Sequence, residues 1–177
     1  MATSTWNIDV AHSSVNFSVR HLVVSKTRGK FLTYGGKVIL DEGDMTLSEV
    51  DVEIDAGSID TGVADRDGHL KSPDFLDTAN HPKIAFRSAK IEKTGESDFA
   101  VSGELTIRGK TKPVLLKTEY SGRGKDPWGG ERIGFTAHTK ISRKDYGLEW
   151  NQLLEAGGAM VGDEVTIEIE LEAIKAA

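Results

Sequence analysis

Cysteine is absent from the 177 residues, which include only 4 prolines and 7% aromatic residues. Without cysteine the chain can form no disulfide framework, no thiolate nucleophile and no cysteine-ligated zinc site. No apolar run approaches the roughly 18 residues that a membrane-spanning helix needs, so we expect no stable membrane insertion. The composition that remains, with 38% hydrophobic and 28% charged residues, is typical of an ordinary soluble globule.

An excess of positive charge is also lacking. The net charge is −6 and the pI is about 5.4, which argues against nucleic acid as the main partner because phosphate binding requires a basic face. The opening residues, MATSTWNID, have neither a basic n-region nor an apolar h-region, so we expect a cytoplasmic protein. A periplasmic protein whose signal had been removed would look the same. The length suits a single domain over residues 1–177.

Apolar and polar residues alternate along most of the chain, which is the period of a half-buried strand. The alternation is found in residues 14–21, 50–55, 84–91, 99–107 and 165–172. Such segments are typical of antiparallel strands with one dry and one wet face. In the first segment we expect Phe17, Val19 and His21 to point inward and Asn16, Ser18 and Arg20 to face water.

Turn-forming residues separate the alternating segments at Gly95-Glu96, at Gly109-Lys110 and in DPWGG at 126–130. Gly35-Gly36 interrupts a strand-like segment, as glycines do where a sheet bends. We count seven or eight strands along nearly the whole chain. That number in one domain predicts an all-β fold with protected edges, either a closed barrel or a sandwich.

Two stretches lack the alternation. The first runs from Ile59 to Pro82, and within it Ser72-Pro73-Asp74 predicts the start of a short helix. The second runs from Tyr146 to Gly158, where EWNQLLEAGG could form one or two helical turns that end at glycine. We therefore expect two elements that are not strands.

Motifs for metal binding and catalysis are missing. The five histidines form neither an HxH nor an HExxH pattern, and DRDG at 65–68 fails as a calcium loop because its glycine comes too early and the final glutamate is absent. No G-x-S-x-G nucleophile motif or phosphate-binding P-loop is present. The aspartates near Asp65 and Asp74 suit turns and helix caps, so we expect no metal and no catalytic site.

The inward face mixes large residues such as Phe31 and Phe86 with small ones such as Gly103 and Ala137. An eight-stranded barrel is just wide enough to be filled by side chains or to hold one slender ligand. Periodicity alone does not separate these two alternatives.

Four segments resemble the YceI-like family of lipocalin-like, lipid-binding proteins. They are WNIDVAHSSVNFSVRHL at the start, TRGKF at 27–31, RDGHLKSPDFLDTANHP at 66–82 with Ile84 and Phe86 after it, and SRKDYGLEW with VGDEVTIEIE near the end. The similarity extends over nearly the whole chain. His81 departs from the family pattern, in which an aromatic residue is expected before Pro82.

The resemblance implies a single extended eight-stranded antiparallel β-barrel, lipocalin-like, with a short capping helix. Its lumen would bind a long-chain isoprenoid amphiphile, of the polyprenyl phosphate or isoprenoid quinone type. The protein would act as a carrier, storage or sequestering protein, without enzymatic activity or cofactor, and a homodimer is also expected. The residues expected to contact the ligand are Phe17, Val19, His21, Phe31, Val52, Ile54, Phe75, Phe86, Leu105, Ile107, Phe135, Ala137, Tyr146 and Trp150.

In the same resemblance, Asp67 and His69 would fix the backbone of the capping segment, and Phe75 would plug or line one end together with Leu70 and Leu76. Two other functions stay open. The first is an enzyme that acts on an isoprenoid lipid through loop residues such as Asp67, His69 and Arg143. The second is a filled barrel that only provides a scaffold for a partner.

Overall fold

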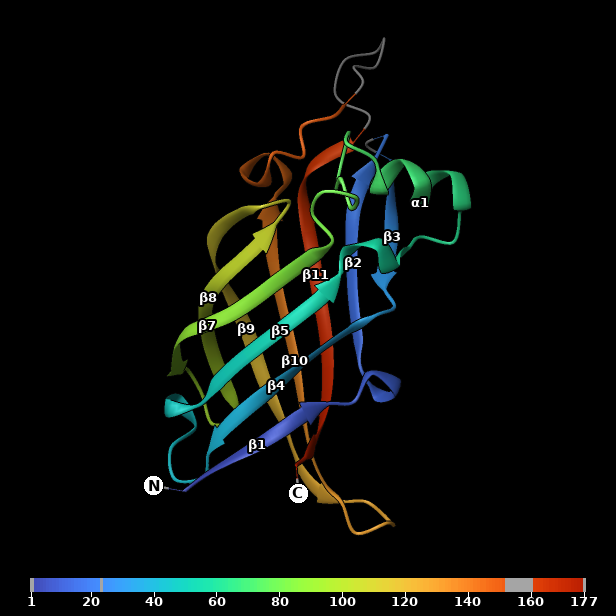
Figure 1. Cartoon of the computed structure of the whole chain (residues 1–177). Coiled ribbons are helices and arrows are strands. Elements are labelled where there is room, and N and C mark those ends of the chain that lie inside the picture. Colours follow the sequence, from blue (N-terminus) through green and yellow to red (C-terminus); the bar gives the residue numbers. More distant parts are fainter. Residues whose placement is uncertain (1, 23, 152–160, 177) are drawn as a thin grey trace.

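The computed structural model describes residues 2–22, 24–151 and 161–176, and its strands form one antiparallel sheet that curls into a barrel (Figure 1). The strands are β1 (Thr3–Ile8), β2 (Ser14–His21), β3 (Ser25–Phe31), β4 (Tyr34–Asp41), β5 (Glu49–Asp55), β6 (Ile59–Asp60), β7 (Lys83–Lys93), β8 (Asp98–Ile107), β9 (Lys110–Lys125), β10 (Glu131–Ser142) and β11 (Val161–Lys175). Eight of them close in the order β1-β4-β5-β7-β8-β9-β10-β11, because β1 pairs with both β4 and β11. The expected eight-stranded antiparallel barrel is therefore confirmed.

The neighbour of β11 changes along its length. Near its C-terminal end β11 pairs with β1, and over most of the remainder it pairs with β2, which carries β3 and β6. The short 3-10 helix η1 (Val10–His12) lies between the two partners. The backbone of Glu172 holds this transition, since its carbonyl accepts from Asp9 N at 2.8 Å and its N–H donates to Ser13 Oγ at 3.0 Å. The chain from β1 through η1 to β2 thus has two roles: β1 closes the barrel, and β2 extends the sheet beyond it.

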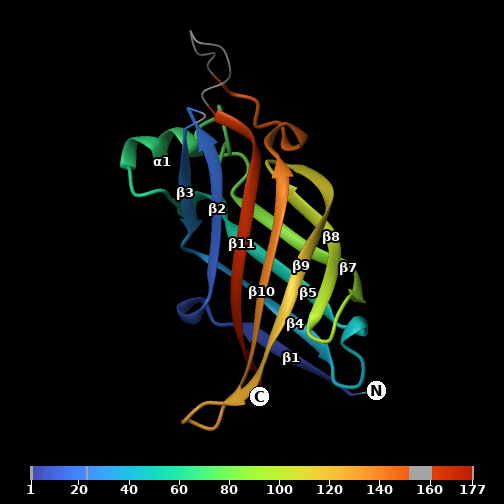
Figure 2. The same ribbon diagram turned by 180° about the vertical axis from the view of Figure 1, so that it is seen from behind.

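The helices are short and lie at the ends of strands. They are α1 (Ala64–Lys71) and the 3-10 helices η2 (Met45–Leu47), η3 (Ala56–Ser58) and η4 (Arg143–Tyr146), besides η1. Helix α1 lies beside β3 at one end of the barrel, and we call this end the α1 end (Figures 1 and 2). Within the described ranges, none of the helices is long and apolar enough to cross a bilayer.

The predicted helix start at Ser72 is wrong, because Ser72 ends α1 instead. Its Oγ donates to the carbonyl of His69 at 2.6 Å, and its backbone is extended with φ −74° and ψ 169°. The residue before a proline is disfavoured in the helical region, so Pro73 stops the helix on its N-terminal side rather than starting one. The second interruption is confirmed at η4, whereas the helical turns expected in 149–158 fall mostly on residues 152–160, outside the described ranges.

The predicted turns lie between strands as expected. Arg108 and Gly109 join β8 to β9 with φ of +51° and +73°, which is the backbone of a type I′ hairpin turn. Gly36 allows β4 and β5 to approach closely, since a Cβ atom at this position would collide with the carbonyl oxygen of Asp51. A side chain at Gly36 would therefore push the two strands apart.

Two apolar clusters pack the barrel at different places. One lies at the α1 end and extends along β7 and β8; its buried members include Ile59, Phe75, Phe86 and Leu105. The other lies where β1 closes the barrel and is centred on Trp6, which is 0% exposed. We call the second end the β1 end. The middle of the barrel lies between these clusters.

An ion network holds the β1 end together from outside. The guanidinium of Arg132 donates to Asp9 Oδ2 at 2.8 Å, to Glu172 Oε2 at 2.9 Å and to Asp126 Oδ2 at 3.0 Å. Hydrogen bonds from Arg132 and then His12 lower the pKa of the Asp9 carboxyl. The backbone N–H of Gly130, and then Arg132, lower the pKa of Asp126.

We predict that Arg132→Gln lowers the free energy of unfolding at neutral pH and that the loss shrinks in acid. A carboxyl whose pKa is depressed by folding stabilises the fold above its unfolded pKa, and this contribution disappears as the pH falls through the folded pKa. Urea unfolding of both proteins at neutral pH and at about pH 3 measures the difference. Lys140→Gln, which removes an exposed 3.6 Å ion pair with Glu164, is the control and should have little effect at either pH. An equal loss at both pH values in Arg132→Gln would contradict the ionic role.

Candidate ligand-binding site

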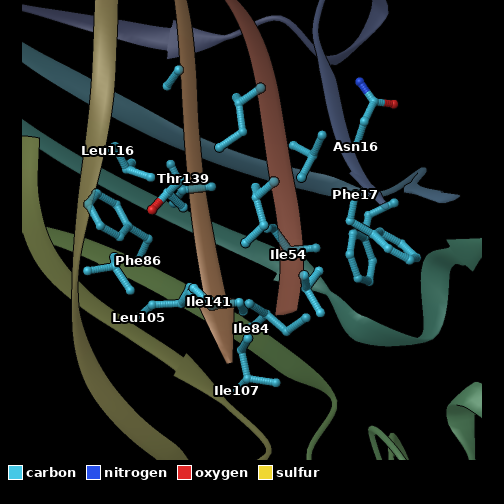
Figure 3. A pocket seen from close by; sticks show the side chains of 18 of the residues that line it. Asn16, Phe17, Ile54, Ile84, Phe86, Leu105, Ile107, Leu116, Thr139 and Ile141 are labelled. Carbon is cyan, nitrogen blue, oxygen red and sulfur yellow. The ribbon is translucent and has the colours of Figure 1, made fainter. Parts of the chain in front are cut away.

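The barrel lumen contains a cavity of about 560 Å³. Its walls come from β2 to β5, from β7 to β11 and from α1, and most of the lining side chains are aliphatic or aromatic. Figure 3 shows Phe86, Leu105 and Leu116 on one side of this space and Ile54 and Phe17 on the other. The volume lies within the range of roughly 300–1,000 Å³ that is typical of small-molecule sites.

The lumen is hollow along β10, β11 and β2 rather than packed. Ala137, Thr139, Ile141 and Ile167 line the cavity from inside a closed barrel, yet each keeps accessible surface and none is fully buried. A packed protein interior leaves few voids larger than a water molecule. The structure therefore argues against a barrel filled by its own side chains.

All the residues predicted to contact a ligand line this cavity except Tyr146. Those that do are Phe17, Val19, His21, Phe31, Val52, Ile54, Phe75, Phe86, Leu105, Ile107, Phe135, Ala137 and Trp150. The structure brings them together from six strands and from the segments after α1 and η4. Contact with a ligand stays a prediction for each of them.

Tyr146 belongs to the buried cluster at the α1 end instead of the cavity wall. The chain leaves the strand at Ser142 and passes through η4, so the alternation of β10 does not continue to Tyr146. Burial raises the pKa of the Tyr146 phenol to about 12, and its hydroxyl has no hydrogen-bond partner in the described structure. Tyr146 thus packs the end of the barrel and is wrong as a cavity residue.

The alternation of β2 is the expected one, because Phe17, Val19 and His21 line the cavity and Ser18 does not. Asn16 also borders the cavity, but its amide donates to Ser14 Oγ at 3.0 Å and points away from the apolar side chains in Figure 3. The sequence did not indicate that Arg20 would border the cavity. It is both exposed and part of the lining, since it lies near the end of β2 at the rim of the barrel.

A group of rings caps the lumen at the α1 end. His69 makes edge contacts with Phe75 at 5.0 Å and with Trp150 at 4.7 Å between ring centroids, and the two larger rings lie 5.4 Å apart. His69 Nε2 also lies 2.9 Å from Asp74 Oδ2. The three rings come from α1, from the turn after it and from the segment after η4, which explains why sequence spacing gave no sign of their contact.

Arg143 is a cation in this cap that is only 4% exposed. Its Nε donates to the carbonyl of Gly162 at 2.8 Å, and its Nη1 donates to the carbonyls of Leu148 at 2.8 Å and Trp150 at 3.3 Å. The guanidinium carbon lies 5.9 Å from the centre of the Phe75 ring, and burial lowers the pKa of the Arg143 guanidinium. Within the described residues no partner is found for Nη2, and Arg143 borders the cavity.

The loop residues of the enzyme alternative have structural partners. Asp67 accepts hydrogen bonds from the backbone N–H and the hydroxyl of Thr61, and thereby ties α1 to the end of β6. Arg66 donates to Thr61 as well, through Nε and Nη2 at 2.8 Å each. These contacts agree with the expectation that Asp67 fixes the capping segment.

Asp9, His12 and Glu172 form a group that sequence spacing missed, with potential ligand atoms within 4.8 Å of one another. The first two residues are far from Glu172 in the chain, and only the pairing at the β1 end joins them. Arg132 donates to both carboxylates, so a guanidinium already supplies the positive charge. The group is therefore better explained as an ion network than as a metal site.

A closed antiparallel barrel with an apolar cavity and a capped end has the architecture of lipocalin-like barrels. The chain belongs to the YceI-like family, because the family model of the YceI-like domain matches residues 6–173. It is 43% identical over 138 residues to Protein YceI of Escherichia coli, a match that covers 78% of this chain and 72% of that protein.

Two solved structures share the fold. BcnA of Burkholderia cenocepacia matches with a TM-score of 0.82 and 24% identity, over 93% of this chain and 98% of BcnA. A polyisoprenoid binding domain from Saccharophagus degradans matches with a TM-score of 0.72 and 16% identity, over 97% of this chain and 98% of that domain. Both similarities show the fold of the whole described barrel.

We predict that Phe75→Ala destabilises the protein by about 3–5 kcal/mol, because a buried ring is lost from a packed cap. Urea unfolding measures the free energy. Trp128→Ala is the matched control: this ring is 84% exposed in the turn between β9 and β10, so its loss should change the free energy by less than about 0.5 kcal/mol. Equal stability of Phe75→Ala and the wild type would contradict the packing of the cap.

Proposed function

We propose that the protein binds a long-chain isoprenoid amphiphile in the barrel lumen and acts as a carrier, storage or sequestering protein. The observation on which this depends is the cavity of about 560 Å³ with apolar walls. Water in such a space would find few polar partners, whereas a buried water normally makes about three hydrogen bonds. An apolar chain makes no hydrogen bonds with water, so it loses none in this cavity, and its burial there removes apolar surface from water.

The family supports the choice of an isoprenoid. The neighbour from Saccharophagus degradans is described as a polyisoprenoid binding domain. At 16% identity that similarity concerns the fold, so the ligand class for this chain depends on the cavity and on family membership. The cytoplasmic location and the homodimer expected from the sequence remain predictions.

The energetics allow tight binding without a strong polar contact. Burial of one methylene contributes about 0.8 kcal/mol, so several isoprene units contribute on the order of tens of kcal/mol before costs. Association and ordering of the chain remove a large part of this gain. What remains suits a carrier, whose site needs apolar surface more than specific hydrogen bonds.

We further propose that the head group lies at the α1 end, beside Arg143. The other end is sealed by the cluster around Trp6, and the polar residues that border the cavity at the α1 end include Arg66, His69 and Arg143. An oxygen of a phosphate or of a quinone could accept hydrogen bonds from Nη2 of Arg143. Such an acceptor would satisfy a buried cation whose hydrogen bonds within the described residues all go to neutral carbonyls.

An enzymatic role finds less support. Asp67 is engaged by Thr61, and His69 is held by Asp74 and two aromatic rings, so neither is placed as an unengaged acid or base. These contacts position the cap. They favour binding over turnover.

Native mass spectrometry of the protein from its own host, followed by lipid extraction, tests the proposed function. We predict that the wild type carries a stoichiometric isoprenoid lipid and that Ala137→Phe carries none, because the added ring occupies the cavity. The same variant should lose less than about 1 kcal/mol of stability, whereas overpacking of a filled core costs about 1–3 kcal/mol. Thr136→Phe, on the outward face of the same strand, is the control and should retain the lipid.

A wild type without lipid, together with a strongly destabilised Ala137→Phe, would show that the barrel is full and would reject the proposal. Turnover of an added isoprenoid lipid would support the enzyme instead. The register shift between Gly134 and Phe135 does not alter the design, since Ala137 still lines the cavity.

The head group gives a separate prediction. A polyprenyl phosphate should bind about 10- to 100-fold more tightly than an isoprenoid hydrocarbon of equal length, because a hydrogen bond to a charged group contributes about 1.5–3 kcal/mol. Titration followed by intrinsic tryptophan fluorescence measures both affinities. In Arg143→Gln the difference between the two ligands should disappear while circular dichroism shows an intact barrel. If the difference persists in that variant, the head group does not lie beside Arg143.

A further inference from the structure

The hairpin formed by β2 and β3 ends in exposed apolar side chains. Val24 is 86% exposed and Leu22 is 40% exposed, at the end of the barrel where α1 lies (Figure 1). Polar side chains at such a tip would be better solvated by water. Leu22 also has a φ of +55°, a left-handed conformation that is uncommon for leucine. An exposed leucine in an unfavourable backbone conformation is a reason to look for a function.

The two strands that carry this tip present a basic outer surface. Arg20 is directly opposite Lys26 in the register and Ser18 is opposite Arg28, so three cations share the outward face; we call Arg20, Lys26 and Arg28 the basic face. Like charges directly opposite each other in a sheet are destabilising. Residues 10–40 contain no aspartate or glutamate, although the whole chain has a net charge of −6.

Two carboxylates of the neighbouring strand are engaged with other residues. On the adjacent strand β11, Asp163 accepts from Ser142 at 2.7 Å, and Glu164 lies 3.6 Å from Lys140. Asp60 is the residue opposite Lys30, farther from the tip. Lys26 and Arg28 make no ion pair within the described ranges.

We propose that the tip of this hairpin docks on an anionic lipid membrane, with Leu22 and Val24 in the interface and the basic face toward the lipid phosphates. Apolar residues flanked by arginine and lysine are the combination that holds peripheral proteins at anionic bilayers. Lysines on an edge strand also discourage strand pairing between molecules, but an exposed leucine and valine beside them would not help in that role. The docked end is the end at which Arg20 and His21 border the cavity.

Docking does not depend on the proposed function, because it concerns the outside of the barrel. The test is co-sedimentation of the full chain with vesicles of phosphatidylglycerol and phosphatidylcholine, compared with vesicles of phosphatidylcholine alone. The wild type should partition onto the first and hardly onto the second, and added salt should release it because salt screens exposed charges.

The hairpin variants separate the two contributions. Leu22→Asn with Val24→Ser should lower partitioning by at least about tenfold through the lost apolar contact. The fold should be intact, since asparagine is well suited to a left-handed φ. Lys26→Gln with Arg28→Gln should lower partitioning roughly thirtyfold, which corresponds to about 1 kcal/mol for each basic residue near an anionic surface.

Two control variants match these changes elsewhere. Trp128→Ser removes an exposed apolar residue in the turn between β9 and β10, at the opposite end of the barrel, and Lys93→Gln with Lys117→Gln removes two exposed cations from β7 and β9. Both should partition like the wild type. Equal binding to both kinds of vesicle, or a loss in the controls as large as in the hairpin variants, would overturn the proposal.

Size-exclusion chromatography of the same variants tests the alternative that the tip contacts another copy of the chain. If Leu22→Asn with Val24→Ser changes the oligomeric state and leaves vesicle binding unaltered, the tip contacts another copy of the chain and the membrane proposal fails. Lipid retained in the lumen of a variant that no longer docks would leave the proposed function intact. Docking by a wild type with an empty lumen would support the membrane proposal and reject the proposed function.

Discussion

Closure of the sheet by β1 is the constraint on which the rest of the structure depends. β1 meets β11 in only three residue pairs, from Trp6 with Lys175 to Ile8 with Ala173. Without this contact the sheet would have two open edges and the lumen would open to water along its length. The closure is reinforced on both sides of the sheet, by Trp6 on the inside and by the bonds of Arg132 to Asp9 and Glu172 on the outside. The junction of β1 and β11, with its three residue pairs, is thus held by packing and charge together.

A barrel that is closed at both ends can be hollow between them. The buried residues concentrate in one cluster at the α1 end and along β7 and β8, and in another at the β1 end. On the opposite wall, formed by β10, β11 and β2 (Figure 2), inward side chains such as Ala137, Ile141 and Ile167 keep accessible surface. Apolar surface that stays unburied contributes nothing to the free energy of folding. The free energy of its burial can therefore be gained when a ligand binds. This division between packed ends and an unpacked wall is how a small domain can be stable and still keep an apolar cavity.

Period-two patterning predicted most of the strands, their inward faces and the barrel, because the alternation of β2 or β11 is imposed locally by the pleat. It failed where a local signal had two meanings. Ser72-Pro73 has the composition of a helix start, but Ser72 stops α1 by bonding to His69. Contacts between distant segments left no pattern at all, as in the rings of His69, Phe75 and Trp150. The volume of the lumen could not be predicted from the sequence either, since the same alternating sequence is compatible with a filled and with a hollow barrel.

The two ends of the barrel differ in how firmly they are held, and this bears on the path of a ligand. At the β1 end a wholly buried tryptophan and an ion network link four strands. At the α1 end none of the residues of α1 is fully buried, and its N-cap residue, Val63, offers no side-chain hydrogen bond. Segments with few buried apolar contacts open locally at lower free energy than the global fold. For the ligand proposed above, a path past α1 would therefore open at a lower free-energy cost than a path through the β1 end.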